Sequence, residues 1–400
     1  MDIISNAFRA ENWPAVESIF WVFVLFVFGS MVGSFLNVCI YRMPRELSVV
    51  RPASHCPKCN YSIPWFLNIP IFTWISLRGK CKNCSEPISP RYLMVEVFTG
   101  AVFATAWAIV ASRSVGLALA YCVILAAFIV ATMIDIEHFI IPDEITIGGI
   151  VAGFIFSALV PQLHSTVDRS EALRASFWGI AVGGGLVYAI LRAGKMAFGK
   201  QKLELGPDSK ITFTETSLKM PDKEMPYEEL FYRKSDYIRL QAKTAEIRFA
   251  EGSEQSDRCY WNVVITLKPE ELQIGEEKFN PEQVPNMEVV TSELVVPREA
   301  MGFGDVKFMA AIGAFLGWQV TIFALMFSAV IGTLVSVGAI VMRRVEWSSR
   351  IPYGPYIALA TVIYMFLPVE QQTAWRDYLA IFSQILPWSK PPAMTNMPGF

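Results

Sequence analysis

Eight apolar segments constrain the fold of this chain more than any other feature of its sequence. They lie at roughly residues 15–40, 93–111, 115–136, 144–160, 173–193, 303–318, 320–342 and 353–367. A helix that crosses a bilayer needs about 20 apolar residues, so most of these segments are close to the required length, while 303–318 and 353–367 are short. The composition agrees, since 53% of the residues are hydrophobic, 18% are charged and the mean hydropathy is +0.39. We therefore predict a polytopic α-helical membrane protein with about eight transmembrane helices.

The distribution of basic residues predicts the orientation of these helices. The 41–92 loop carries eight Lys and Arg against two Glu, and the 343–352 connection holds Arg343, Arg344 and Arg350. The loops 112–114 and 161–172 hold only Arg113 and Arg169. Basic loops stay in the cytoplasm, so we expect both basic loops there and both chain termini outside. The first apolar segment is too long for a signal peptide and lacks a cleavage site of small residues, so we expect it to be retained.

The segment 195–299 differs from the rest of the chain. It is charged and has no apolar run long enough to cross a membrane. Alternating stretches at 210–214, 237–240 and 262–267 are typical of strands. We predict an inserted β-rich cytoplasmic domain with an unknown partner. The predicted parts are an outer tail and first transmembrane helix (1–40), a cytoplasmic loop (41–92), helices (93–194), the insertion (195–299), helices (300–367) and an outer tail (368–400).

Two aspartates stand beside apolar segments. Asp135 ends the third segment, and Asp305 follows Gly302-Phe303-Gly304 at the start of the sixth. A carboxylate at the middle of a membrane helix costs about 2.5–3.5 kcal/mol, so such residues are functional candidates. The predicted topology places both at the cytoplasmic face, where a pair sharing one proton could activate water against a peptide bond. The simpler alternative is that each aspartate caps a helix or faces water.

Three charged neighbours have less specific interpretations. We expect Asp143 to cap the helix that follows it and Glu137 to be solvated. Either one could instead be a secondary site residue. Lys307 is placed to hold the anionic pair or an acidic residue of a substrate.

Four cysteines form two C-x-x-C pairs in the basic loop. They are Cys56, Cys59, Cys81 and Cys84. This pattern predicts a structural zinc site with four thiolate ligands. The alternative is a pair of disulfides, which a cytoplasmic loop does not favour. We expect Cys39 and Cys122 to be buried as small apolar residues, and His55 and His138 to lie at the surface.

Motifs over most of the chain outside 195–299 resemble the bacterial type IV prepilin peptidases. They include Gly33-Ser34-Phe35-Leu36-Asn37-Val38, the two C-x-x-C pairs, Arg78-Gly79-Lys80-Cys81, Ile88-Ser89-Pro90-Arg91-Tyr92 with Glu96 and Thr99-Gly100, Ile134-Asp135 to Ile141-Pro142-Asp143, Gly302-Phe303-Gly304-Asp305-Val306-Lys307, Gly313-Ala314-Phe315-Leu316-Gly317-Trp318 and Ile351-Pro352-Tyr353-Gly354-Pro355-Tyr356.

The resemblance implies a bifunctional enzyme of the bacterial inner membrane. Such an enzyme removes the leader peptide of prepilins and pseudopilins on the cytoplasmic side. It then methylates the new N-terminal residue from S-adenosylmethionine. The resemblance makes Asp135 and Asp305 the catalytic pair, gives zinc to the four cysteines, and places Gly79 and Lys80 in the segment associated with methyl transfer.

One feature departs from the family pattern. The two aspartates are usually separated by a much shorter segment, whereas 169 residues lie between them here. The difference is about the size of the predicted insertion. Closing a longer loop costs only about 0.6 kcal/mol per doubling of its length, so the pair can still form.

Two other functions are compatible with parts of this pattern. A presenilin-like protease that cuts within the membrane shares the Gly-x-Gly-Asp motif but needs no zinc loop. A non-enzymatic zinc-ribbon scaffold for pilus assembly would use the insertion as a docking module and would not need the aspartates.

Overall fold

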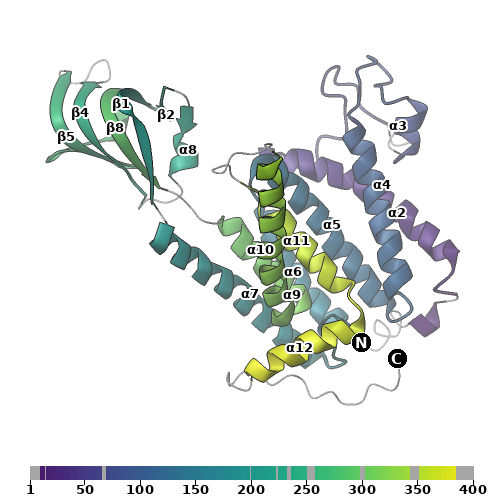
Figure 1. The fold of residues 1–400 in the computed structure, drawn as a ribbon. Helices are drawn as coiled ribbons and strands as arrows, with labels where there is room; N and C mark the ends of the chain where they lie inside the picture. The colour runs from purple at the N-terminus through teal and green to yellow at the C-terminus, as the bar shows by residue number, and fades with distance from the viewer. Residues whose placement is uncertain are drawn as a thin grey trace. The chain divides into compact units, whose positions relative to one another are not determined.

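The computed structural model describes residues 10–13, 15–64, 69–198, 200–221, 224–231, 236–249, 257–297, 302–342 and 351–383. Contacts divide the chain into two compact units, Met1–Tyr188 with Gly302–Phe400 and Ala189–Met301 (Figure 1). The first unit is helical and the second contains the sheet. Each unit is described separately below. The expected basic residues Arg343, Arg344 and Arg350 lie outside the described residues.

Helices occupy all eight predicted apolar segments. The helices and helical turns of the first unit are η1 (Ala10–Asn12), α2 (Ile19–Arg42), η2 (Met43–Arg45), α3 (Phe72–Ser76), α4 (Pro90–Val110), α5 (Val115–His138), α6 (Asp143–Leu159), η4 (Pro161–His164), α7 (Arg169–Phe198, which continues into the second unit), α9 (Phe303–Leu316), α10 (Trp318–Val341), α11 (Gly354–Met365) and α12 (Val369–Ser383).

Five helical segments of the described chain are long and apolar enough to cross a membrane. They are Ile19–Arg45, Pro90–Val110, Val115–His138, Arg169–Met196 and Trp318–Val341. The other three predicted spans form shorter helices, because α6 has 17 residues, α9 has 14 and α11 has 12. At about 1.5 Å per residue, α9 and α11 are shorter than a hydrocarbon core of about 30 Å. The structure thus supports a membrane protein with at least five helices of spanning length.

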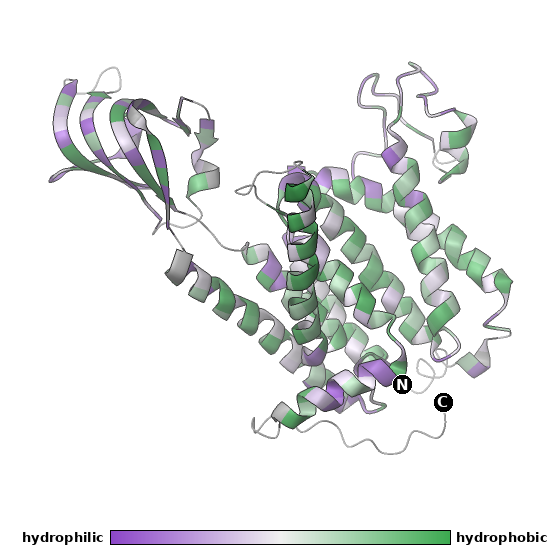
Figure 2. Cartoon of the chain, in the orientation of Figure 1, coloured by the Kyte–Doolittle hydropathy of each residue, from purple (hydrophilic) through white to green (hydrophobic). Residues whose placement is uncertain are grey.

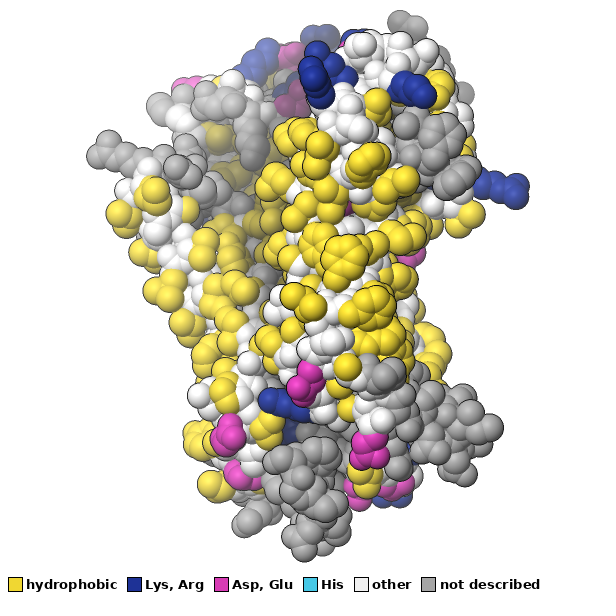
Figure 3. Space-filling view, turned by 90° about the vertical axis from the view of Figure 1, so that its right-hand side faces the viewer, with side chains coloured by type: hydrophobic (Ala, Val, Ile, Leu, Met, Phe, Trp, Pro, Cys, Tyr) yellow, Lys and Arg dark blue, Asp and Glu magenta, His cyan; other side chains and the backbone are white. Residues whose placement is uncertain are grey.

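The surface of the helical unit has the apolar belt that such helices require. Figure 2 shows apolar residues along the helices of this unit and mixed polarity along the strands of the other. Figure 3 shows hydrophobic side chains across the middle of one face, with charged side chains gathered toward its two ends. Phe20, Phe23 and Phe28 of α2 and Met94 and Phe98 of α4 are exposed. A soluble protein rarely exposes a patch of this extent, so the belt fits contact with lipid.

Small residues hold the helices close together. The pairs α2 with α4, α6 with α9 and α10 with α11 pack most extensively. The α7 and α9 backbones meet where Gly179 faces Gly313, and neither position has room for a side chain. Gly183 likewise contacts the Met309 carbonyl, as expected for glycines inside a membrane span. This packing fixes the position of α9, which begins with the Gly302-Phe303-Gly304-Asp305 segment.

The second unit is an antiparallel sheet of eight strands in the order β3-β2-β1-β8-β4-β5-β6-β7. Its elements are β1 (Lys200–Thr214), β2 (Ser217–Lys219), β3 (Glu224–Pro226), α8 (Tyr227–Leu230), β4 (Ile238–Arg248), β5 (Arg258–Lys268), β6 (Glu271–Ile274), β7 (Glu277–Phe279), η5 (Pro281–Gln283) and β8 (Asn286–Pro297). The predicted strands at 210–214, 237–240 and 262–267 fall within β1, β4 and β5, with β4 beginning one residue later than expected.

The sheet has its own core. Buried and exposed residues alternate along β4, as a strand with one covered face requires. The buried face includes Ile211, Leu240, Ile265 and Leu294. Its first and last strands are neighbours, with Lys200 paired to Pro297. The insertion therefore leaves and rejoins the chain at one place.

Candidate active site and metal centre

Asp135 lies near the end of α5 with its carboxylate facing the start of another helix. The residue is 5% exposed. The backbone N–H of Gly354, the first residue of α11, donates a 2.8 Å hydrogen bond to Asp135 Oδ2. The N-terminus of a helix carries free N–H groups and partial positive charge, so it suits a carboxylate. A Cβ added at Gly354 would lie 2.8 Å from the same oxygen, which explains why glycine stands there.

Asp305 lies in the first turn of α9. It is 8% exposed, and its backbone N–H donates to the Gly302 carbonyl at 3.3 Å. Gly302 and Gly304 on either side of Phe303 leave the backbone open to close contacts. A Cβ at Gly304 would lie 3.4 Å from Ile141 Cβ, so the first turn of α9 packs directly on the connection between α5 and α6.

Ile141 brings the two aspartates together. It is buried between the end of α5 and the start of α6, where it contacts both Gly304 and Gly354. The starts of α9 and α11 therefore meet at the same connection that follows Asp135. Both aspartates are therefore buried beside the same connection, although 169 residues separate them in the sequence.

The charged neighbours of the pair have other partners than expected. The prediction that Asp143 caps α6 is wrong, because Pro142 is the N-cap and Asp143 is the first helical residue. Lys307 Nζ donates to Asp143 Oδ1 at 2.6 Å, so this lysine joins α9 to α6 rather than holding the aspartate pair. Glu137 is exposed, as expected, and also forms an ion pair with Arg91 at the start of α4.

The four cysteines of the basic loop converge, as predicted. Their sulfur atoms all lie within 4.8 Å of one another. Cys56 Sγ and Cys84 Sγ are 3.8 Å apart, and Cys59 Sγ and Cys81 Sγ are 4.0 Å apart. Zinc–sulfur bonds of about 2.3 Å in a tetrahedron require sulfurs about 3.8 Å apart. A disulfide requires about 2.05 Å, and all four thiols are free. The cluster is therefore suited to a metal ion.

The two C-x-x-C pairs form matching turns. Asn60 N–H donates to the Cys56 carbonyl at 2.9 Å, and Ser85 N–H donates to the Cys81 carbonyl at 3.0 Å. Asn60 and Ser85 each follow the second cysteine of a pair, and each has a positive φ, 53° and 59°. These turns aim both sulfurs of a pair in one direction. Hydrogen bonds from the Asn83 side chain and the Tyr61 backbone lower the pKa of Cys59, whereas the pKa of Cys84 is raised by burial and by the neighbouring thiols.

Gly79 and Lys80 lead into the second cysteine pair. Gly79 has a φ of 66°, and a Cβ there would lie 2.8 Å from the Trp74 ring. Ile88 N–H donates to the Gly79 carbonyl at 2.7 Å, and the Trp74 indole N–H donates to the Ile88 carbonyl at 3.3 Å. Lys80 is exposed. The positive φ and the nearby Trp74 ring explain why glycine stands at position 79. The role of Gly79 and Lys80 in methyl transfer remains a prediction.

Glu96 is a buried carboxylate to which the sequence gave no role. It lies in α4 and accepts a 2.7 Å hydrogen bond from the backbone N–H of Ile71. Ile71 belongs to the basic 41–92 loop that carries the four cysteines, which we call the metal loop. Ile71 has a φ of 63°, which is rare for a β-branched residue. Glu96 therefore anchors the loop to α4 at a strained position. The predictions for four isolated residues are confirmed. Cys39 and Cys122 are buried, and His55 and His138 are exposed.

Comparison with known proteins places the chain in a family. The model of the bacterial peptidase A24 N-terminal domain matches residues 27–110. The model of the type IV leader peptidase family matches residues 122–205 and 287–337. The first match contains all four cysteines, and the second contains both aspartates. The interruption between 205 and 287 falls within the sheet unit, which agrees with its position as an insertion.

Several curated relatives are named prepilin leader peptidase/N-methyltransferase. The protein from Aeromonas hydrophila is 25% identical over 366 residues, covering 85% of this chain and 89% of the relative. That from Klebsiella pneumoniae is 32% identical over 186 residues, or 44% and 81% of the two chains. That from Myxococcus xanthus is 39% identical over 160 residues, or 40% and 44%. No solved structure matches the chain significantly. The chain therefore belongs to the type IV leader peptidase family, which is a family of enzymes.

Proposed function

We propose that this enzyme is an aspartic endopeptidase that removes the leader peptide of prepilins and pseudopilins, with Asp135 and Asp305 as its catalytic pair. The names of the relatives support the reaction and the substrate class. The observation that supports the residues is that Asp135 of α5 and Asp305 of α9 are both buried and lie beside the same connection, where Ile141 contacts Gly304 and Gly354. A pair of interacting carboxyls in a poorly solvated site shares one proton, which provides an acid and a base together.

The hydrogen bond from Gly354 suggests how the two roles divide. Asp135 Oδ2 accepts a hydrogen bond from the Gly354 N–H, and this bond favours the ionised form of the Asp135 carboxyl group. Asp135 is therefore the better general base, taking a proton from water as it attacks the scissile carbonyl. Asp305 then supplies its proton to the leaving amine. Both residues return to their starting states when one proton passes from Asp135 back to Asp305.

The membrane arrangement is part of the same proposal. We propose that α6, α9 and α11 also belong to the membrane part, as eight predicted spans require. The basic 41–92 loop supports a cytoplasmic position for the metal loop and for the aspartate site, in the bacterial inner membrane. The 195–299 insertion would then face the cytoplasm as an accessory module for a partner that is not identified.

Two further components belong to the proposal. Cys56, Cys59, Cys81 and Cys84 hold a structural zinc ion, since four thiolates leave no position for water. S-adenosylmethionine supplies the methyl group that the names of the relatives imply. We assign Gly79 and Lys80 to that second reaction on resemblance, with the loop as their scaffold.

Co-expression with a tagged prepilin tests the function. N-terminal mass spectrometry of the product reports leader removal and methylation in one spectrum. We expect Asp135→Asn and Asp305→Asn each to abolish leader removal at normal abundance in the membrane, because asparagine keeps the size but not the acid–base chemistry. Asp143→Asn is the matched control and should retain cleavage, since this carboxylate is paired with Lys307. Processing at the wild-type rate by either variant of the pair would favour the scaffold alternative.

A further inference from the structure

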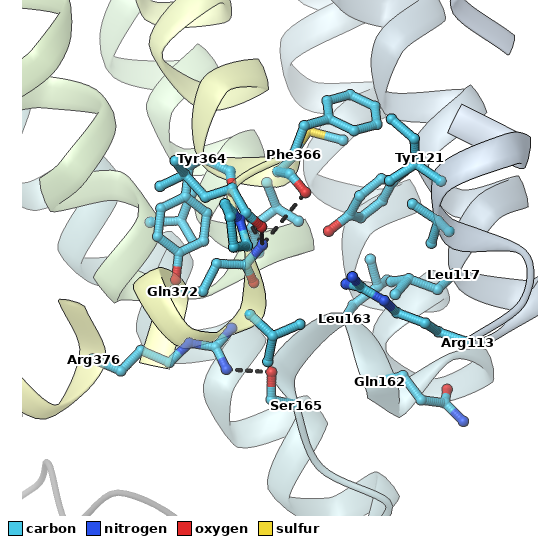
Figure 4. Close-up of a pocket in the computed structure, with 18 residues that line it drawn as sticks. Arg113, Leu117, Tyr121, Gln162, Leu163, Ser165, Tyr364, Phe366, Gln372 and Arg376 are labelled. Carbon is cyan, nitrogen blue, oxygen red and sulfur yellow. Dashed lines mark hydrogen bonds between the residues drawn. The ribbon is translucent and has the colours of Figure 1, made fainter. Parts of the chain in front are cut away.

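A pocket lies at the end of the helical unit opposite the aspartates. It has a volume of about 380 Å³ and is lined by the ends of α4 and α11, the starts of α5, α10 and α12, and η4 (Figure 4). Tyr121 of α5 lines it, 14 residues before Asp135 in the same helix. At 1.5 Å per residue this corresponds to about 21 Å along α5. The pocket is therefore separate from the proposed peptidase site.

The lining carries positive charge without a counter-charge. Arg113, between α4 and α5, and Arg376 of α12 enter from opposite sides in Figure 4. None of the residues that line the pocket is an aspartate or a glutamate. Neither arginine has a carboxylate partner within the described part of the chain. Arg376 donates a hydrogen bond to the Ser165 hydroxyl.

A buried hydroxyl without a partner marks the same pocket. Tyr364 lines it and is 3% exposed, yet its hydroxyl has no hydrogen-bond partner among the described residues. A buried polar group without a partner is costly, so a ligand that accepts a hydrogen bond there would remove the cost. The rim beside it is ordered, because Gln372 Nε2 donates to the carbonyls of Tyr364 and Leu367 at 3.2 and 3.0 Å.

We infer that this pocket binds a phosphate group. Two guanidinium groups supply planar sets of N–H donors that match phosphate oxygens, and the Tyr364 hydroxyl is a further donor among the residues that line the pocket. The volume suits a headgroup-sized ligand. Ile109 and Val369 line the pocket and are 44% and 47% exposed, so apolar side chains surround its mouth. A membrane phospholipid would place its phosphate between the arginines and its acyl chains along these residues. A free phosphate compound would use the donors alone.

Native mass spectrometry of the full-length protein, purified in mild detergent, tests the inference. We expect the wild type to retain phospholipid, and the Arg113→Gln/Arg376→Gln variant to bind it about a hundredfold more weakly. Tyr364→Phe removes one donor with little change of volume and should weaken binding about tenfold. Arg174→Gln is the matched control, because Arg174 is exposed on α7 and does not line the pocket. It should bind as the wild type does.

A second arm separates the sources of the phosphate. Delipidated protein is titrated with inorganic phosphate and, separately, with short-chain phosphatidylglycerol, while phosphorus NMR follows binding. Tighter binding of the lipid identifies a phospholipid site, and equal binding identifies a site for soluble phosphate compounds. Either result supports the inference if the Arg113→Gln/Arg376→Gln variant no longer binds the ligand. Equal binding by this variant and the wild type, or no binding of either ligand, would overturn it. Leader removal is not read in these experiments, so failure here leaves the proposed function unaffected.

Discussion

At the scale of single residues, the site depends on positions where only one side chain fits. Gly354 is the clearest case, because its N–H holds Asp135 while its missing Cβ leaves room for the carboxylate. Ile141 has the complementary role, filling the space between Gly304 and Gly354. In the proposed mechanism the carboxylates supply the chemistry, and these neighbours determine where the carboxylates lie.

We predict that Gly354→Ala lowers leader removal at least about tenfold without loss of the protein from the membrane. The added methyl group would displace Asp135 from its hydrogen bond, and small displacements of catalytic groups are costly. The initial rate of prepilin cleavage, with membrane abundance measured beside it, checks this. Gly338→Ala in α10 is the control, since a Cβ there meets nothing within 4 Å. Equal rates for the two variants would contradict the proposed role of Gly354.

His164 provides a pH-dependent prediction about stability. Burial, with a smaller effect of the Arg376 charge, lowers the pKa of His164 from its ordinary 6.5 to about 4. Its Nε2 lies 2.7 Å from the Ser157 hydroxyl, at the turn between α6 and α7. Below pH 6.5 the unfolded chain binds a proton that the folded chain excludes, so stability falls as the pH decreases toward 4.

Relative to neutral pH, this effect costs about 2 kcal/mol at pH 5. Thermal unfolding of detergent-solubilised protein at pH 7.5 and 5 measures it. His164→Gln should be less stable at pH 7.5 but should lose less stability on acidification. A variant with the same pH dependence as the wild type would show that other groups cause the acid sensitivity.

At the scale of elements, the metal loop illustrates a structure too small to form without its ligand. Between the end of α2 and the start of α4, the described residues contain only the short helices η2 and α3, and the two cysteine turns add local hydrogen bonds. Glu96 and the Arg91–Glu137 pair attach this loop to α4 and α5. Zinc is therefore expected to stabilise the loop and, through these contacts, the end of α5 that carries Asp135.

We predict that replacing Cys56 and Cys59 together by serine releases one zinc ion per chain and makes the loop sensitive to proteases. The reason is that thiolate binding of the metal also supplies the folding energy of such a loop. Elemental analysis and limited proteolysis of the purified protein measure the two effects. Cys259→Ser, at an exposed thiol in β5, should keep its metal. Purified wild-type protein without zinc would refute the assignment.

At the scale of the whole molecule, the sheet unit is separable from the chemistry. None of the proposed site residues lies in Ala189–Met301, and the family match skips 206–286. Because Lys200 pairs with Pro297, the ends of the insertion are about 5 Å apart. Removing the sheet thus leaves a gap that a short linker can close.

We predict that replacing 200–296 by a short flexible linker preserves cleavage of a generic prepilin. The physical reason is that α7 and α9 pack through Gly179 and Gly313, independently of the sheet. Cleavage should be measured after the variant is shown to reach the membrane at normal abundance. A well-expressed but inactive variant would mean that the insertion belongs to the catalytic machinery.

The sequence alone determined the features that depend on local composition or short spacing. The apolar segments predicted all eight helices, because desolvation forces such segments to satisfy their backbone internally. The paired C-x-x-C motifs predicted the four-thiol cluster, since each pair lies within one turn. Alternating residues predicted β1, β4 and β5. The motifs around Asp135 and Asp305 indicated the family from the order of their residues alone.

Tertiary structure decided what depends on contacts between distant residues. The sequence placed Asp143 as a cap and Lys307 beside the anionic pair or an acidic residue of a substrate, whereas the structure pairs the two residues across 164 positions. It gave Gly354, Ile141 and Glu96 no role, because their importance arises from helix ends that meet only after packing. The pocket between Arg113 and Arg376 could not be predicted from the sequence either, because residues from several helices line it. Residues from several helices form these sites together. A local sequence pattern does not show which helix ends contact one another after packing.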